Sequence, residues 1–197
     1  MKRKCLILAA ILLCSLSALA VQSISNPTLR EELLKRVKVD QEMRNEISRK
    51  YPNGVVISKE DHERWEKVDT DNTARMKQII QDQGWPGKSM VGEDGAHAAW
   101  LLVQHADLDH EFQKQCSKLL EKAVEAKEAS GKDLAYLTDR VRVAEDKPQV
   151  YGTQMKFIEG KLGPAPIEDE ANVDKRRAAV GLEPLADYVK KLTGKDN

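Results

Sequence analysis

The chain has 197 residues and carries 32 basic and 32 acidic side chains, so its formal net charge is zero at neutral pH. Such a well-mixed charge does not favour nucleic acid or an anionic lipid surface as a partner. The length is sufficient for one domain with its own hydrophobic core.

The N-terminal segment has the layout of a secretory signal peptide. A basic start (residues 2–4) precedes a short apolar stretch (6–13), and small residues suited to cleavage follow at 18–20. The apolar stretch is too short to span a bilayer comfortably. A lipoprotein anchor at Cys14 is the alternative, but Leu13 stands where the lipoprotein peptidase requires a small residue. We therefore predict export of the chain, to the periplasm or the cell exterior, after removal of residues 1–20.

Removal of the signal peptide changes the composition of the predicted mature chain. The remaining residues, 21–197, carry 29 basic and 32 acidic side chains, because three basic residues leave with the peptide. Cys116 is then the last cysteine, and it cannot form an intramolecular disulfide. Its position on an apolar helix face predicts an inert packing role. We predict no membrane span in the mature chain, since it has no second long apolar stretch.

The first two thirds of the mature chain predict four helices. The first covers 27–49, with Asn26 as N-cap and a proline in its first turn, and the second begins after Ser58 and ends at Gly84. Asp69 or Asp71 could instead cap a new helix and break the second one at 69–72. The third helix is predicted to begin near Gly95, and the fourth covers about 109–129.

The last third has a different amino-acid composition, which predicts a β-hairpin. The segments 140–143 and 150–158 are rich in β-branched and aromatic residues, and "AEDKP" between them is typical of a turn. Glycines and prolines then mark a loop, and two short helices near 172–180 and 184–193 close the chain. The predicted fold is mainly α, a single-domain helical bundle over 21–197 with a small β-hairpin near 140–158.

Polar residues interrupt the buried face of the first helix. Leu33, Val37, Asp40, Arg44 and Ile47 follow one another at steps of four, three, four and three, which places them on one face. One interpretation is a partly buried ion pair that holds helices in register. The other is that Asp40 and Arg44 line a polar cavity.

The stretch "AAWLLVQHADLDHEF" (98–112) raises the same question for a histidine. His105 shares a face with Leu101, so it is either a core histidine with satisfied hydrogen bonds or a catalytic residue. Asp107 or Asp109 could cap the next helix, which would place His105 at the carboxyl end of its own. His105 and Asp109 have the i, i+4 spacing of metal ligands, but no HExxH motif is present, and we predict no metal site.

The predicted hairpin carries further polar side chains. Asp139 and Arg140 are expected at a helix-to-strand junction, and Gln149, Tyr151 and Gln154 belong to the second strand. These side chains suit a polar ligand, and they equally suit the attachment of the hairpin to the helices. The glycine at 152 would let another backbone or a ligand come close.

Several sequence blocks in fixed order resemble a known family. These are "DQEMR" (40–44), "GWPGKSMVG" (84–92), "AAWLLVQHAD" (98–107), "YLTDR" (136–140), "QVYGTQ" (149–154), "PIED" (166–169), "VDKRRAAVGL" (173–182) and "PLADY" (184–188). They resemble the bacterial family known as domain of unknown function 6624, over essentially the whole mature chain. The resemblance implies a bacterial source and no established activity.

Three functional hypotheses remain open. In the first, a pocket between the helices and the hairpin binds a small polar or anionic molecule, or a peptide, through Asp40, Gln41, Arg44, Gln104, His105, Asp139, Arg140, Gln149, Tyr151 and Gln154. In the second, the pocket belongs to a hydrolase or transferase. His105 would then be the general base, Asp139 or Asp40 its orienting partner, and Arg140 or Tyr151 the stabiliser of negative charge.

In the third hypothesis, the constellation is a structural polar core and function lies at an unmarked surface. The sequence contains no GxSxG elbow, P-loop or dinucleotide fingerprint, and we predict no cofactor.

Overall fold

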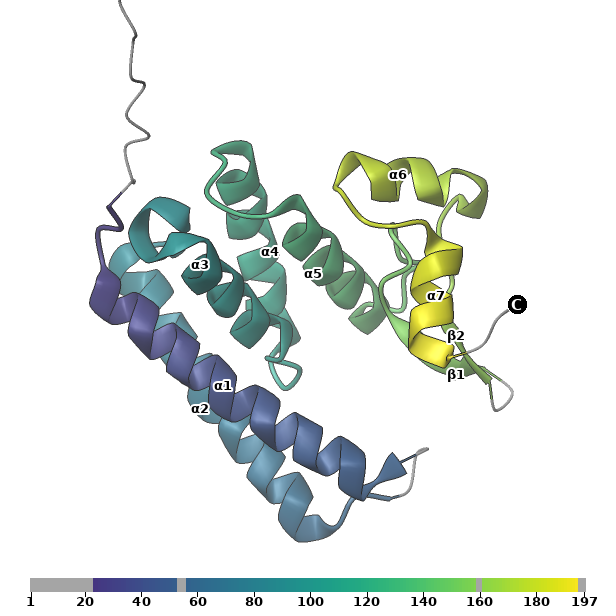
Figure 1. Ribbon diagram of the computed structural model, residues 1–197, viewed down its shortest axis with the longest axis horizontal. Coiled ribbons are helices and arrows are strands. Elements are labelled where there is room, and N and C mark those ends of the chain that lie inside the picture. The colour runs from purple at the N-terminus through teal and green to yellow at the C-terminus, as the bar shows by residue number, and fades with distance from the viewer. Residues whose placement is uncertain (1–22, 53–55, 159–160, 195–197) are drawn as a thin grey trace, which may run out of the picture.

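The computed structural model describes residues 23–52, 56–158 and 161–194, which form a mainly helical fold (Figure 1). The predicted signal peptide (1–20), with Cys14, lies outside these ranges. The described helices are α1 (Pro27–Lys50), α2 (Lys59–Gln83), α3 (Lys88–Gln104), α4 (His110–Glu125), α5 (Gly131–Ala144), η2 (Glu170–Asn172, a 3-10 turn), α6 (Val173–Ala179) and α7 (Leu185–Thr193). One antiparallel hairpin pairs β1 (Met155–Ile158) with β2 (Lys161–Pro164). The predicted class, mainly α with a single hairpin, is confirmed.

The first two helices form a long hairpin that extends beyond the other helices (Figure 1). Their predicted caps are confirmed, because the side chain of Asn26 accepts from the Leu29 amide and that of Ser58 accepts from the Asp61 amide. The suggested break at 69–72 does not occur, and α2 runs without interruption. Asp69 is buried in this helix, so it serves tertiary contacts and caps nothing.

The hydrophobic core forms around α3, which contacts α1, α2, α4 and α5. This helix begins at Lys88, earlier than predicted, and its φ of 76° at Gly92 gives it a kink. Its buried residues, among them Leu102 and Val103, pack with buried apolar residues of the neighbouring helices, among them Leu33, Met76, Ile79, Phe112, Leu120 and Leu137. Of the helices in the described ranges, none combines the length and the apolar character that a membrane crossing needs.

The predicted position of the hairpin, near 140–158, is wrong. The observed strands lie later in the chain, so the segment predicted as the second strand contains the first one. Residues 140–143 continue α5, because Leu134, Leu137 and Val141 recur at helical spacing and pack on the core. An alternation of arginine and valine over only four residues is compatible with a helix and with a strand, so tertiary packing determines which of the two forms. Residues 150–154 form a loop, and β2 lies in a segment whose glycine and proline suggested an irregular turn.

Asp139, in the last part of α5, anchors that loop. Its buried carboxylate accepts from the amides of Val150 (2.7 Å), Tyr151 (3.0 Å) and Thr153 (2.9 Å), and from the Thr153 hydroxyl (3.0 Å). Gly152 has a φ of +71°, and a β-carbon there would lie 2.8 Å from a methyl group of Leu185. The loop is therefore fixed from one side by a carboxylate and from the other by the close approach of α7.

Replacement of Asp139 by alanine is expected to destabilise the protein strongly. Three backbone amides and a hydroxyl would lose their acceptor in a buried site, which should lower the free energy of unfolding by about 3 kcal/mol or more. Chemical denaturation measures this change. Asp82→Ala, at an exposed position in α2, is the control and should change stability by less than about 0.5 kcal/mol. Equal effects of the two substitutions would contradict the anchoring role.

Cys116 is fully buried on the core side of α4, as its predicted packing role requires. Burial raises the pKa of its thiol to about 12. We expect no reaction with a thiol reagent at pH 8 in the folded protein and full reaction after denaturation, because the thiolate is the reactive species. Rapid labelling of the native protein, followed by mass spectrometry, would show this account of the core to be incorrect.

Candidate functional site

The ten residues selected from the sequence lie in three groups, which the described contacts do not join into one. We call them the His105 group (Asp40, Gln41, Arg44 and His105), the Arg140 pair (Gln104 and Arg140) and the Asp139 group (Asp139, Gln149, Tyr151 and Gln154). The described contacts give three local arrangements, and the expected meeting of all ten at one hollow stays a prediction.

The His105 group is organised around Asp40, whose side chain is 0% exposed. One oxygen accepts from Arg44 Nε at 2.9 Å. The other lies 2.8 Å from His105 Nδ1 and accepts from Gln41 Nε2 at 2.9 Å. Asp40 thus joins α1 to the carboxyl end of α3, where His105 is the C-cap residue as predicted.

Arg44 extends this group to α2 through residues that the sequence analysis missed. Its Nη2 donates to Asp69 at 2.5 Å, and its guanidinium lies 4.7 Å from the ring centre of Trp65. The indole of Trp65 donates to the second oxygen of Asp69 at 2.7 Å. A signal was available, since Trp65, Asp69 and Met76 recur at helical spacing on one face of α2.

The two buried carboxyl groups differ in their electrostatics. Burial by itself would raise the pKa of Asp40, but the hydrogen bond from His105 and the charges of His105 and Arg44 outweigh it and lower the pKa. Burial raises the pKa of Asp69, and the contacts with Arg44 offset this only in part. Asp40 is therefore the carboxylate that stays ionised beside the histidine.

This arrangement fixes the imidazole of His105. An ionised carboxylate can only accept hydrogen bonds, so Nδ1 carries the proton and, in the neutral ring, Nε2 carries the free lone pair. The His105 side chain is 15% exposed, and Nε2 is neither bonded to nor enclosed by the described residues. A neutral His105 held in this way can accept a hydrogen bond or a proton from a molecule in solvent.

The Arg140 pair lies between α3 and α5. Arg140 is within α5, which corrects its predicted place at a helix-to-strand junction. Its Nη1 donates to both oxygens of Asp107, at 3.2 and 3.3 Å. Among the described residues, Arg140 Nε and the amide oxygen of Gln104 are enclosed without a hydrogen-bond partner.

The Asp139 group is bonded mainly to the backbone. Gln149 donates to the carbonyl oxygens of Gln154 and Ala165 and accepts from the Gln154 amide. The Gln154 side chain donates to Thr153 Oγ1 at 2.9 Å. These contacts fix the loop and its neighbours, which corresponds to the alternative of attachment between hairpin and helices. A role in ligand binding stays a prediction for this group.

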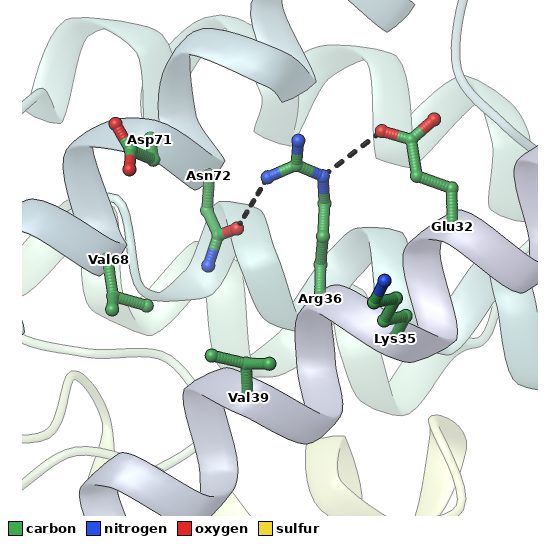
Figure 2. Close-up of a pocket in the computed structure, with 7 residues that line it drawn as sticks. All are labelled: Glu32, Lys35, Arg36, Val39, Val68, Asp71 and Asn72. Carbon is green, nitrogen blue, oxygen red and sulfur yellow. Dashed lines mark hydrogen bonds and ion pairs between the residues drawn. The ribbon is translucent and has the colours of Figure 1, made fainter.

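A separate groove of about 360 Å³ lies between α1 and α2 (Figure 2). It is lined by Glu32, Lys35, Arg36, Val39, Val68, Asp71 and Asn72. Arg36 donates to Glu32 and to Asn72, so the main polar groups of the groove satisfy one another. Val39 and Asp40 are consecutive in a helix and point about 100° apart, so this groove belongs to another face of α1.

Metal-ligating side chains occur in pairs in the described structure. His105 contacts Asp40, and His97 contacts Asp133 at 3.1 Å. The parts of the chain that the structure describes contain no group of three or more histidine, cysteine or acidic side chains placed to hold a metal ion. Asp109 caps α4 by accepting from the Phe112 amide, which confirms one of the two caps considered for that helix.

Comparison of the sequence with known proteins identifies the family of the chain. Neither a curated protein nor a solved structure shows significant similarity to it. A family model described as a family of unknown function (DUF6624) matches residues 27–196, which is most of the chain. The protein therefore belongs to the DUF6624 family.

Proposed function

We propose that the protein binds a small polar ligand at His105, with Nε2 of the imidazole as the acceptor that contacts it. The single observation behind the proposal is the contact of 2.8 Å between His105 Nδ1 and the fully buried Asp40, combined with an Nε2 that the described residues leave open. A buried carboxylate is costly unless donors surround it, and here the donors also orient a partly exposed ring.

The surroundings support a rigid site. Arg44 is held by Asp40, Asp69 and the ring of Trp65, so the carboxylate that orients His105 is itself fixed. An acceptor with a fixed direction loses little conformational entropy when a ligand binds. A histidine that merely filled space in the core would need neither the buried charge nor the open nitrogen.

Hydrolysis is the second candidate function, favoured by the same contact between Asp40 and His105. A buried carboxylate on Nδ1 stabilises the imidazolium that forms when Nε2 takes a proton. His105 would then act as a general base on a water molecule, which would be the nucleophile because no hydroxyl or thiol group is hydrogen-bonded to the His105 ring in the described structure.

We also propose that these functions take place after export. The basic start, apolar stretch and small residues of segment 1–20 support removal of a signal peptide. The N-terminal sequence of the protein recovered from its native cells tests this, and a first residue near position 21 is the expected result.

The binding proposal predicts a selective effect of His105→Gln. The glutamine keeps polarity and similar size, but it replaces the rigid ring that Asp40 orients by a flexible amide without a directed acceptor and without a group that takes up a proton, so ligand affinity should fall about tenfold or more. The test screens small polar compounds by thermal shift and then measures their affinities by calorimetry. His62→Gln, an exposed histidine on α2, is the matched control and should bind like the wild type.

Asp40→Asn separates binding from catalysis. If His105 is a general base, loss of the charge should reduce turnover far more than ligand affinity. Unchanged binding in His105→Gln, measured with any compound that the wild type binds, would refute the site. If the wild type binds compounds at His105 but hydrolyses none of them, hydrolysis of those compounds is refuted and the binding proposal stands.

A further inference from the structure

The Arg140 pair has a defined place relative to His105. His97 contacts Asp133 and Trp100 contacts Tyr136, both at an offset of 36 residues, so α3 and α5 run side by side in the same direction. The same offset places Gln104 opposite Arg140, one helical turn after the aromatic pair. Gln104 directly precedes His105 in the chain, which brings Arg140 to the same end of α3.

Arg140 uses few of its donors in the described structure. Its side chain is 32% exposed, and only Nη1 has a partner, Asp107. The Nε–Nη2 edge, which carries the two parallel N–H groups that fit a carboxylate or phosphate, has no described partner. Distances of 3.2 and 3.3 Å to Asp107 are also long for a charged pair, for which 2.7–2.9 Å is typical.

The neighbouring groups indicate an incomplete arrangement. The buried amide oxygen of Gln104 has no donor, and the indole N–H of Trp100, one turn earlier on α3, has no acceptor. Buried polar atoms in this condition destabilise a fold unless another molecule supplies their partners. Asp107 is a partly exposed carboxylate, so it occupies one donor of Arg140 as a ligand carboxylate would.

We infer that Arg140 recognises an oxyanion, a carboxylate or phosphate group, on the ligand that His105 binds, an inference that rests on the proposed function. The oxyanion contacts the Nε–Nη2 edge after a small movement of the side chains that cover Nε. Asp107, which accepts from Nη1, repels the oxyanion and offsets part of the guanidinium charge. His105 Nε2 contacts a second polar group of the ligand, so the two residues together select small acids that carry a further polar group.

The test titrates the protein with sodium acetate and, separately, with sodium phosphate, at constant ionic strength. Nuclear magnetic resonance follows the Arg140 Nε–H and the His105 ring signals. Saturable shifts at Arg140 are expected, and the stronger of the two anions distinguishes a carboxylate from a phosphate ligand. Arg140→Gln should weaken the binding about tenfold or more. Arg30→Gln removes a guanidinium from an exposed ion pair with Asp94 and should leave the binding unchanged.

Asp107→Asn provides a second variant at a partly exposed position. Removal of the competing charge should tighten anion binding roughly threefold, because exposed ion pairs contribute free energies of that order. Asparagine keeps an oxygen for the contact with Gln113, so the fold should tolerate the change. If Arg140→Gln does not fold, this variant decides, and unchanged or weaker binding overturns the inference.

Two outcomes separate the inference from the proposed function. No saturable shift at Arg140 with either anion, or equal affinity in Arg140→Gln, overturns the inference. Neutral compounds that shift the His105 ring signals of the wild type, and bind more weakly to His105→Gln, then leave the proposed function standing. Saturable anion binding at Arg140 supports recognition of the oxyanion, and polar compounds that bind His105→Gln as tightly as the wild type contradict the role of His105.

Discussion

The burial of one carboxylate, Asp40, constrains the arrangement of the first three helices. An ionised group with no exposed surface is tolerated only where donors surround it, and the donors here come from α1 itself and from His105 at the end of α3. Arg44 then carries the constraint to α2 through Asp69 and Trp65. The polar network therefore fixes how the long α1–α2 hairpin meets the core, where apolar contacts alone would permit sliding.

The contact between Asp40 and His105 also determines which polar groups lie at the carboxyl end of α3. Because Asp40 is the partner of Nδ1, Nε2 is the acceptor of the neutral ring, and no described residue is hydrogen-bonded to it. The register of α3 and α5 places Gln104 on the side of α3 next to α5, while the adjacent His105 contacts Asp40 of α1. The end of α3 thus presents an oriented acceptor beside an arginine with unused donors, a combination suited to small acids.

Local patterns predicted much of this structure, and contacts between distant segments account for the rest. The shared face of Asp40 and Arg44 followed from helical spacing, and the contact of 2.9 Å confirms it. Asp69 looked like a helix cap, because a cap and a buried ion-pair partner have the same residue type and only tertiary packing separates them. Residues 140–143 had the alternation of a strand, yet they continue α5, and the partly buried Val141 packs against the core from this helix. Asp139 was selected as a ligand contact, and its carboxylate is occupied by backbone amides that no sequence pattern could assign to it.

The proposed site depends on which nitrogen of His105 carries the proton in the neutral ring, and nitrogen-15 chemical shifts of the imidazole measure this directly. We expect a protonated Nδ1 and an unprotonated Nε2 in the neutral ring, with the pattern lost in Asp40→Asn. A wild-type protein with the proton on Nε2 would contradict it, because Asp40 would then not orient the ring and no free acceptor would face solvent.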